Sequence, residues 1–371
     1  MSRKSPNRTA TVQEGSSRDS IAIAGGGLIG LSIAWRLAQQ GWPVTILEKG
    51  SIGREASWAG AGMLAPGGEI EARSRLATLS LESRRLYGAF VNELEAASGY
   101  RIDYQECGSL DVAYSPDDLA LLEARAARQA EIGILSKPLT IAQVRTFWPH
   151  VRSEGLAGAR FYPEDAIVNP RELVAALASA CLKLNVHIVE HSAVTGATVT
   201  TDAVHVETIS GAHRCGALVV AAGAWSDSIA IDGTLPIPAA EPVKGHLIGY
   251  HQPEQTCSTI IRHGSVYLLQ RANGLLIAGA SVEHIGFNRG IDPRIVSDLA
   301  AAAGFVLPHL HETTPSEKWI GFRPGSDDLH LGLWDSKRLY LAYGHYRNGI
   351  LLAPVTAQNL ADEISANLQT R

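Results

Sequence analysis

The distribution of apolar and polar residues divides this chain into segments of two kinds. A short apolar run at residues 20–24 precedes a helix-like stretch at 28–40, and a second apolar run follows at 43–47. This succession predicts a strand, a helix and a second strand, which is the βαβ unit of parallel sheets. Further helices are expected at residues 76–98, 117–131 and 171–184.

Short apolar runs elsewhere in the chain predict further strands. They lie at residues 101–114, where Gly108 interrupts the run, and at 186–189, 204–209, 217–222, 247–250, 259–262, 266–270 and 275–278. Asn273 and Gly274 separate the last two runs, and an Asn-Gly pair is typical of a tight hairpin. The later runs therefore predict an antiparallel sheet.

The predicted elements do not separate into an N-terminal and a C-terminal half. The run 217–222, followed by Gly223, has the character of a nucleotide-domain strand although it lies far along the chain from the first strand. We therefore expect an interleaved α/β architecture with a mostly antiparallel domain inserted into a nucleotide-binding domain. The nucleotide-binding domain is expected to comprise residues 20–75, 165–235 and 320–371, and the substrate domain residues 76–164 and 236–319.

A glycine motif lies between the first predicted strand and helix. Gly25, Gly27 and Gly30 form G-x-G-x-x-G, which permits a tight turn, a close approach of the backbone to a pyrophosphate and close helix packing. The N-terminus of the helix would then face the phosphates. Glu48 ends the second strand, where it is placed to accept hydrogen bonds from ribose hydroxyls and disfavours the 2′-phosphate of NADP. The motif in this context predicts a dinucleotide site.

Composition excludes several other classes of function. The 371 residues include 32 basic and 37 acidic ones, for a net charge of −5 with no basic stripe, so a nucleic-acid partner is not expected. No apolar stretch reaches the roughly 18 residues needed to span a bilayer. Four cysteines without C-x-x-C spacing and histidines without metal-site spacing predict no metal site and a cytoplasmic protein with reduced thiols. Residues 1–19 are polar, without the apolar core of a secretory signal, and are expected to be a disordered leader.

Seven sequence pieces in one order resemble the FAD-dependent amine oxidases that include glycine oxidase, D-amino acid oxidase and sarcosine oxidase. The likeness is closest to the glycine oxidases of the thiamine pathway and covers nearly all of residues 21–367. The pieces are GGGLIG, SWAGAGMLAP, DAIVNPRELV, VVAAGAWSD, PVKG, GFRPGS and GHYRNGILLAP. The resemblance implies a D-amino acid oxidase-like fold with an FAD-binding, Rossmann-like domain of the GR2 type. Because no cysteine follows Cys257, the covalent C-terminal cysteine linkage of sarcosine oxidases is absent and noncovalent FAD is expected.

The resemblance also implies which residues contact the cofactor. Small residues in SWAGAGMLAP would let the backbone lie against the flat flavin ring. The expected FAD-binding residues are Gly25, Gly27, Leu28, Ile29, Gly30, Glu48, Ser57, Ala61, Gly62, Met63, Val194, Gly223, Trp225, His345, Tyr346, Arg347, Asn348, Gly349, Ile350 and Leu351.

Two arginines in glycine-rich, apolar surroundings are the candidate substrate ligands. A guanidinium pairs with a carboxylate through two parallel hydrogen bonds, so a buried arginine beside a flavin would anchor an amino acid. Arg323 matches the family's carboxylate-binding arginine, Arg347 a second arginine that closes the pocket, and Tyr267 the tyrosine that supports the same carboxylate. The alternatives are an ion pair of Arg323 with Asp327 or Asp328, and a plain sheet tyrosine.

Some positions near the substrate depart from the family pattern. Val282 stands where glycine oxidase has a methionine and Ser265 where it has a histidine, changes that are expected to reshape the pocket. Glu283, His284 and Asn288 follow in a loop that either projects into the site or lies on the surface.

The implied reaction is the oxidation of glycine, sarcosine or a small D-amino acid. Hydride from Cα would pass to flavin N5, the imine would hydrolyse to a 2-oxo acid and ammonia, and O₂ would be reduced to H₂O₂. No residue is assigned as a catalytic acid or base. The alternatives are a dehydrogenase subunit that passes electrons to a quinone or a partner, and a flavin-binding or NAD-binding protein without turnover. The sequence leaves the oligomeric state open, a homo-oligomer included.

Overall fold

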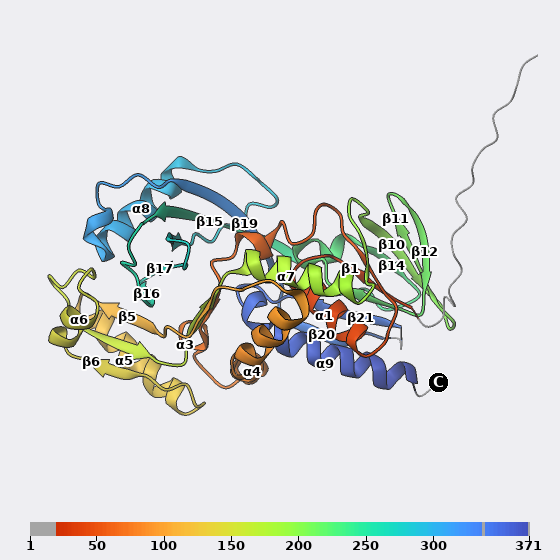
Figure 1. Ribbon diagram of the computed structural model, residues 1–371, viewed down its shortest axis with the longest axis horizontal. Helices are drawn as coiled ribbons and strands as arrows, with labels where there is room; N and C mark the ends of the chain where they lie inside the picture. Colours follow the sequence, from red (N-terminus) through yellow and green to blue (C-terminus); the bar gives the residue numbers. More distant parts are fainter. Residues whose placement is uncertain (1–19, 336–337, 370–371) are drawn as a thin grey trace, which may run out of the picture.

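The computed structural model describes residues 20–335 and 338–369, and the predicted leader 1–19 lies outside the described residues. Two large sheets lie toward opposite ends of the long axis of the molecule (Figure 1). A separate three-stranded sheet is made of β3 (Met63–Leu64), β8 (Ala166–Val168) and β4 (Tyr104–Gln105).

A six-stranded sheet contains the predicted βαβ unit. Its order is β20 (His330–Leu333), β21 (Leu339–Tyr343), β13 (Ala217–Val220), β1 (Ile21–Ala24), β2 (Val44–Leu47) and β9 (His187–Val189). All neighbours are parallel except the edge pair of β20 and β21. Strands β1 and β13 are buried at every residue, which explains why their sequences read as continuous apolar runs.

Different layers cover the two faces of this sheet. One face packs against α1 (Leu28–Gln39), α4 (Arg75–Ser98), α7 (Pro170–Lys183) and α9 (Gly349–Gln369), which share one apolar core. The other face packs against a four-stranded sheet of β10 (Val194–Val199), β11 (Val204–Thr208), β12 (Gly211–Cys215) and β14 (Ala230–Asp232). The three layers together exclude water from both faces of the parallel sheet.

The second large sheet has eight strands. Its order is β19 (Glu317–Gly325), β15 (Glu241–His251), β18 (Leu275–Gly279), β17 (Val266–Gln270), β16 (Ile260–His263), β5 (Ser109–Ala113), β7 (Gly158–Tyr162) and β6 (Lys137–Leu139). Only β16 and β5 run parallel among these pairs. Strands β17 and β18 form the predicted hairpin, and Gly274 adopts φ of 84° in its turn.

Helices flank this sheet at the same end of the molecule. Helix α8 (Pro293–Val306) contributes to a core with β15, β17 and β18, while α5 (Pro116–Ala130) and α6 (Ile141–Phe147) lie beside β5, β6 and β7 (Figure 1). Ser115 is the N-cap of α5, and its side chain accepts a hydrogen bond from the Asp118 amide at 3.1 Å. None of the helices within residues 20–335 and 338–369 is long and apolar enough to cross a bilayer.

Two of the expected domain limits cut through packed elements. Helix α4, assigned from the sequence to the substrate domain, packs with α1, α7 and α9 through Tyr87, Phe90 and Leu94. Residue 320 lies inside β19, which pairs along its whole length with β15 of the eight-stranded sheet. By packing, α4 therefore groups with the helices of the six-stranded sheet, and β19 groups with the eight-stranded sheet. The assignment of these two parts as a nucleotide-binding domain and a substrate domain stays a prediction.

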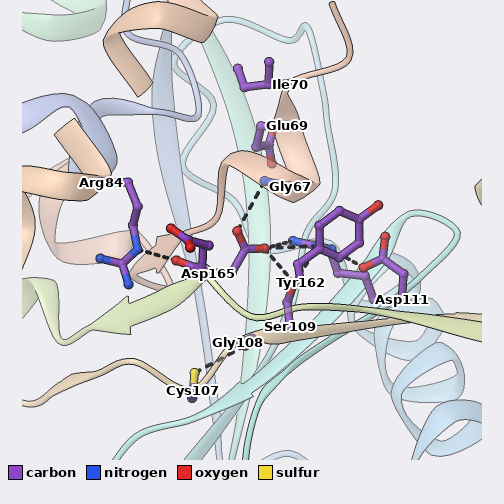
Figure 2. Close-up of polar contacts among 12 residues, drawn as sticks. Gly67, Glu69, Ile70, Arg84, Cys107, Gly108, Ser109, Asp111, Tyr162 and Asp165 are labelled. Carbon is purple, nitrogen blue, oxygen red and sulfur yellow. Dashed lines mark hydrogen bonds and ion pairs between the residues drawn. The ribbon is translucent and has the colours of Figure 1, made fainter. Parts of the chain in front are cut away.

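A buried polar network ties the eight-stranded sheet to the short helix α3 (Pro66–Glu69). Arg262 of β16 contacts Asp111 at 2.6 Å and Asp165 at 3.2 Å, and both carboxylates are 2% exposed. Asp165 also accepts hydrogen bonds from Ser109 Oγ at 2.6 Å and from the amide of Gly67 at 3.3 Å (Figure 2). The network therefore fixes the position of α3 relative to the sheet.

We expect Arg262→Met to destabilise the protein by about 3 kcal/mol, because it leaves buried Asp165 without its cation, whereas Asp111 keeps its ion pair with Arg125. Equilibrium unfolding in denaturant measures the loss. Arg145→Met, at an exposed position of α6, is the matched control and should change the free energy of unfolding by less than about 0.5 kcal/mol. Equal stability of the two variants would contradict the structural role of the network.

Candidate active site

A cavity of about 430 Å³ extends between the nucleotide-binding layers and the eight-stranded sheet. Its walls come from segments that lie far apart in the sequence. They include the N-terminus of α1, the end of β2, the segment from α2 (Ala56–Ala59) to β3, the start of the 3₁₀ helix η1 (Gly223–Ser228), strands β15, β17 and β19, and the turn before α9. The fold thus assembles the cavity at the carboxyl ends of parallel strands, where α/β sheets bind ligands.

The turn between β1 and α1 requires its glycines. Gly25 has φ of 111° and a side chain there would collide with the carbonyl of Ala221. Gly27 is the N-cap of α1 and supplies no side-chain cap, while Ser57 Oγ accepts the Leu28 amide at 2.9 Å. The remaining amides of the first helical turn have no carbonyl partner within the helix and are available to an anion.

Glu48 lies at the end of β2, is 7% exposed and lines the cavity. Its Oε2 accepts the Gly26 amide at 2.7 Å and its Oε1 accepts the Gly50 amide at 2.8 Å. Each carboxylate oxygen keeps a further lone pair, so the side chain can still accept from ribose hydroxyls. The two amides hold the carboxylate in a single orientation.

The turn from β21 into α9 has an unusual backbone. Tyr346 has φ of 48°, which non-glycine residues seldom adopt, and its amide donates to Pro324 O at 3.1 Å. Beside it, His345 is buried, bonds Thr356 Oγ1 through Nε2 at 3.1 Å, and has its pKa lowered to about 3 by burial. His345 is therefore neutral at physiological pH. The positive φ of Tyr346 is a strained conformation of the kind that clusters at functional sites.

Arg323 on β19 and Tyr267 on β17 both line the cavity. Burial lowers the pKa of Arg323, and among the described residues its guanidinium bonds only the carbonyls of Ser281 at 3.0 Å and Lys244 at 3.5 Å. Burial also raises the pKa of Tyr267, although Arg323 and Arg347 act in the opposite direction, so its hydroxyl keeps its proton. A desolvated cation without a carboxylate and a protonated phenol together suit a ligand carboxylate.

Two glycines on neighbouring strands leave room for these groups. A side chain at Gly245 would lie 2.5 Å from both terminal nitrogens of Arg323, and one at Gly279 would lie 2.6 Å from the Tyr267 hydroxyl. Neither glycine has a positive φ, so the reason is space rather than backbone conformation. The glycine of the PVKG piece is thereby explained.

Arg347 and Glu69 form an ion pair beside these residues. Arg347 Nη2 lies 3.1 Å from Glu69 Oε1, and the side chains are 32% and 20% exposed. Glu69 reaches the cavity because the polar network of Figure 2 holds α3 in place. In the described part of the chain Arg347 is therefore neutralised and Arg323 is not.

The structure brings most of the predicted site residues to one cavity. Those that line it are Gly25, Gly27, Leu28, Ile29, Glu48, Ser57, Ala61, Gly62, Met63, Val194, Gly223, Trp225, Tyr267, Arg323, His345, Tyr346, Arg347, Gly349 and Ile350.

Three predicted cofactor residues do not line the cavity. Gly30 lies inside α1 and contacts the turn at Gly25, where a side chain would collide with the Gly25 carbonyl, so its place there is explained by close packing. Asn348 accepts the Leu352 amide at 2.8 Å at the start of α9. Leu351 is 2% exposed in the helical core.

The positions that depart from the family pattern also lie outside the cavity. Val282 and Ser265 are exposed and do not line the cavity, so they do not reshape this pocket. Glu283 is outside the lining too and bonds His246 Nδ1 at 2.7 Å.

Sequence reasoning missed Glu69, Lys49 and Phe322, which all line the cavity. Lys49 Nζ lies 3.3 Å from the centroid of the Trp225 ring. The only sequence signal for Lys49 as a cavity residue is its position directly after Glu48. Nothing in the sequence around Glu69 distinguishes it from an exposed loop carboxylate.

Comparison with known proteins agrees with this geometry. Residues 20–363 match the family model DAO, described as FAD dependent oxidoreductase. The chain belongs to this family. A glycine oxidase of Geobacillus kaustophilus (strain HTA426) is 32% identical over 93% of this chain and 92% of its own length. The crystal structure of glycine oxidase from Geobacillus kaustophilus superimposes with a TM-score of 0.88 at 30% identity, covering 94% of each chain.

A second kind of relative contains an additional unit. The bifunctional protein ThiO/ThiG of Synechocystis sp. (strain ATCC 27184 / PCC 6803 / Kazusa) is 34% identical over 93% of this chain, which spans 51% of that protein. The family and these relatives confirm the α/β fold, the dependence on FAD and the resemblance stated above.

The residues present fit the FAD of this family. The remaining free amides at the N-terminus of α1 suit the pyrophosphate, Glu48 suits the ribose, and the small residues 59–62 suit the flavin ring. Gly62 has φ of 104° and a side chain there would collide with the Val168 carbonyl, so this wall cannot carry a bulkier residue.

The lowered pKa of His345 predicts acid sensitivity. Because the folded protein holds this ring neutral while the unfolded chain protonates it below about pH 6.5, its contribution to stability falls as the pH decreases below that value. Between pH 7 and pH 5 the loss from this residue should be about 2 kcal/mol.

Urea unfolding of His345→Gln at the two pH values measures the effect. The variant should lose about 2 kcal/mol less than the wild type over this interval. His311→Gln, at an exposed position, should behave as the wild type does. The same pH dependence in wild type and His345→Gln would show that His345 does not contribute.

Proposed function

We propose that this protein oxidises a small amino acid, glycine foremost, at its Cα to the imine. The partly buried guanidinium of Arg323 carries this proposal, because it lines the cavity of an FAD-dependent oxidoreductase together with Tyr267 and has no carboxylate partner among the described residues. Glycine, sarcosine and small D-amino acids all present the carboxylate that such a pair binds. The names of the relatives, glycine oxidase, favour glycine among them.

Binding at this pair would orient the substrate. Arg323 would hold the carboxylate through two parallel hydrogen bonds, with the phenol of Tyr267 as a further donor. Bound FAD supplies the acceptor for the hydride of Cα. Positioning of this kind contributes several kcal/mol toward lowering a barrier, and Arg347 with Glu69 would close the cavity over the substrate.

For a primary amino acid, the overall conversion consumes the amino acid, O₂ and water and yields a 2-oxo acid, ammonia and H₂O₂; sarcosine would release methylamine in place of ammonia. Glycine would give glyoxylate through its imine. The relatives named ThiO/ThiG support the further proposal that the imine serves thiazole formation in thiamine biosynthesis. A cytoplasmic location belongs to the same proposal and is supported by four free thiols among the described residues.

Anaerobic reduction of the purified, yellow holoprotein tests the substrate class. Glycine, sarcosine, D-alanine, D-proline and the L-isomers of the last two are mixed with the enzyme and flavin bleaching is followed. We expect glycine to bleach the flavin and L-alanine to leave it oxidised. Stoichiometric H₂O₂ on admission of air would identify O₂ as the acceptor, whereas reduction without H₂O₂ would favour a dehydrogenase.

Arg323→Ala should weaken substrate binding while leaving cofactor content unchanged. Loss of a buried charge pair costs roughly 2–5 kcal/mol, so the KM for glycine should rise by at least about thirtyfold. Steady-state kinetics and the ratio of flavin to protein absorbance measure the two quantities. Arg294→Ala, at an exposed position of α8, is the control. Unchanged KM in Arg323→Ala would remove Arg323 from substrate binding.

A further inference from the structure

Residues 281–292 form a strap that connects β18 to α8 and lies outside the cavity. Most of the strap is exposed, and Val282, Ile285 and Phe287 are 48%, 49% and 44% exposed. Its first part is held by two backbone hydrogen bonds of 2.9 Å between Glu283 and Lys244 of β15. Phe287 stacks on the ring of Trp225 at a centroid distance of 4.6 Å. The strap is therefore held by specific polar contacts together with this aromatic packing.

One buried side chain holds both ends of the strap. His246 of β15 is fully buried, with Nδ1 2.7 Å from Glu283 Oε1 and Nε2 accepting the Asp292 amide at 2.9 Å. Because Nε2 accepts a hydrogen bond, the ring proton of the neutral histidine is on Nδ1 and is donated to Glu283. Glu283 is thus the acceptor that fixes the ring.

The same carboxylate is linked to the guanidinium in the cavity. Ser281 Oγ donates to Glu283 Oε1 at 2.6 Å and accepts the His246 amide at 2.8 Å. The carbonyl of Ser281 then accepts Arg323 Nη1 at 3.0 Å. A continuous path of hydrogen bonds runs from Glu283 through Ser281 to Arg323.

We infer that Glu283 is a positioning residue for the substrate carboxylate. Arg323 has no carboxylate partner among the described residues, and its shortest hydrogen bond goes to the Ser281 carbonyl. Because the guanidinium is planar, this hydrogen bond sets the orientation of all its donors. Glu283 and His246 hold that carbonyl in place. The inference rests on the proposed function, because it assigns to Arg323 the binding of a carboxylate.

Electrostatics alone would give the opposite effect of a Glu283 substitution. Removal of a negative charge near a cationic site strengthens the binding of an anion, because the net positive potential rises. If Glu283 instead acts by holding Ser281, its removal weakens anion binding. The direction of the change in affinity therefore separates the two effects.

The experiment uses the FAD-loaded protein and acetate, a carboxylate that does not react. Changes in the flavin absorbance give the Kd of acetate, and steady-state kinetics give KM and kcat for glycine. In Glu283→Ala we expect the acetate Kd and the glycine KM to rise about tenfold, the value of roughly one hydrogen bond to a charged group, with kcat within about twofold of wild type. Glu283→Gln keeps an acceptor oxygen for both donors and should stay within about threefold.

Two further variants complete the design. Glu312→Ala removes a carboxylate at an exposed position and should leave acetate binding unchanged. Ser281→Ala keeps the carbonyl but removes the hydroxyl, and it should also raise the acetate Kd. This variant takes the place of Glu283→Ala if that variant yields no holoprotein.

Tighter or unchanged acetate binding in Glu283→Ala, or equal losses in the Ala and Gln variants, would overturn the inference. A kcat that falls as steeply as KM rises would also overturn it, since that indicates general distortion. A wild-type holoprotein that neither binds acetate nor is reduced by any amino acid would instead overturn the proposed function.

Discussion

The cavity end formed by β17 and β19 depends on one partly buried positive charge, the guanidinium of Arg323, to which we assign the binding of a substrate carboxylate. Burial of a cation is unfavourable unless an opposite charge or several acceptors compensate it. Here the compensation within the described residues comes from two backbone carbonyls, at 3.0 and 3.5 Å. An anionic ligand would complete the compensation, so the fold favours a carboxylate at the position where no side chain supplies one.

The neighbouring ion pair shows the contrast. Arg347 has Glu69 at 3.1 Å and is more exposed, so its charge is both neutralised and screened. Two arginines that look alike in the sequence are therefore electrostatically different in the structure. The difference comes from α3, which is held against the sheet by the hydrogen bond from the Gly67 amide to Asp165 (Figure 2). Glu69 of this helix pairs with Arg347.

The nucleotide-binding end depends on backbone geometry rather than on charge. Gly25 and Gly62 have φ of 111° and 104°, and at both positions a side chain would collide with a backbone carbonyl. At the start of α1 the N-cap residue Gly27 has no side chain, and Ser57 accepts only the Leu28 amide. A cradle of this kind binds phosphate through amides and the helix dipole, which explains why the motif needs no lysine.

Local patterns determined a large part of this protein. The strand, glycine turn and helix at residues 21–39, the hairpin at Asn273 and Gly274, and the position of Glu48 follow from short-range spacing, because tight turns and helix ends impose specific residues. The family pieces placed Arg323, Tyr267 and Arg347 near one another, and the structure brings them to one cavity. Only the tertiary structure decided that α4 packs on the nucleotide layers, that β19 belongs to the second sheet, and that Glu69 and the Glu283 path reach the arginines. These contacts join residues far apart in the chain, and their geometry depends on how whole layers pack, which residue spacing does not encode.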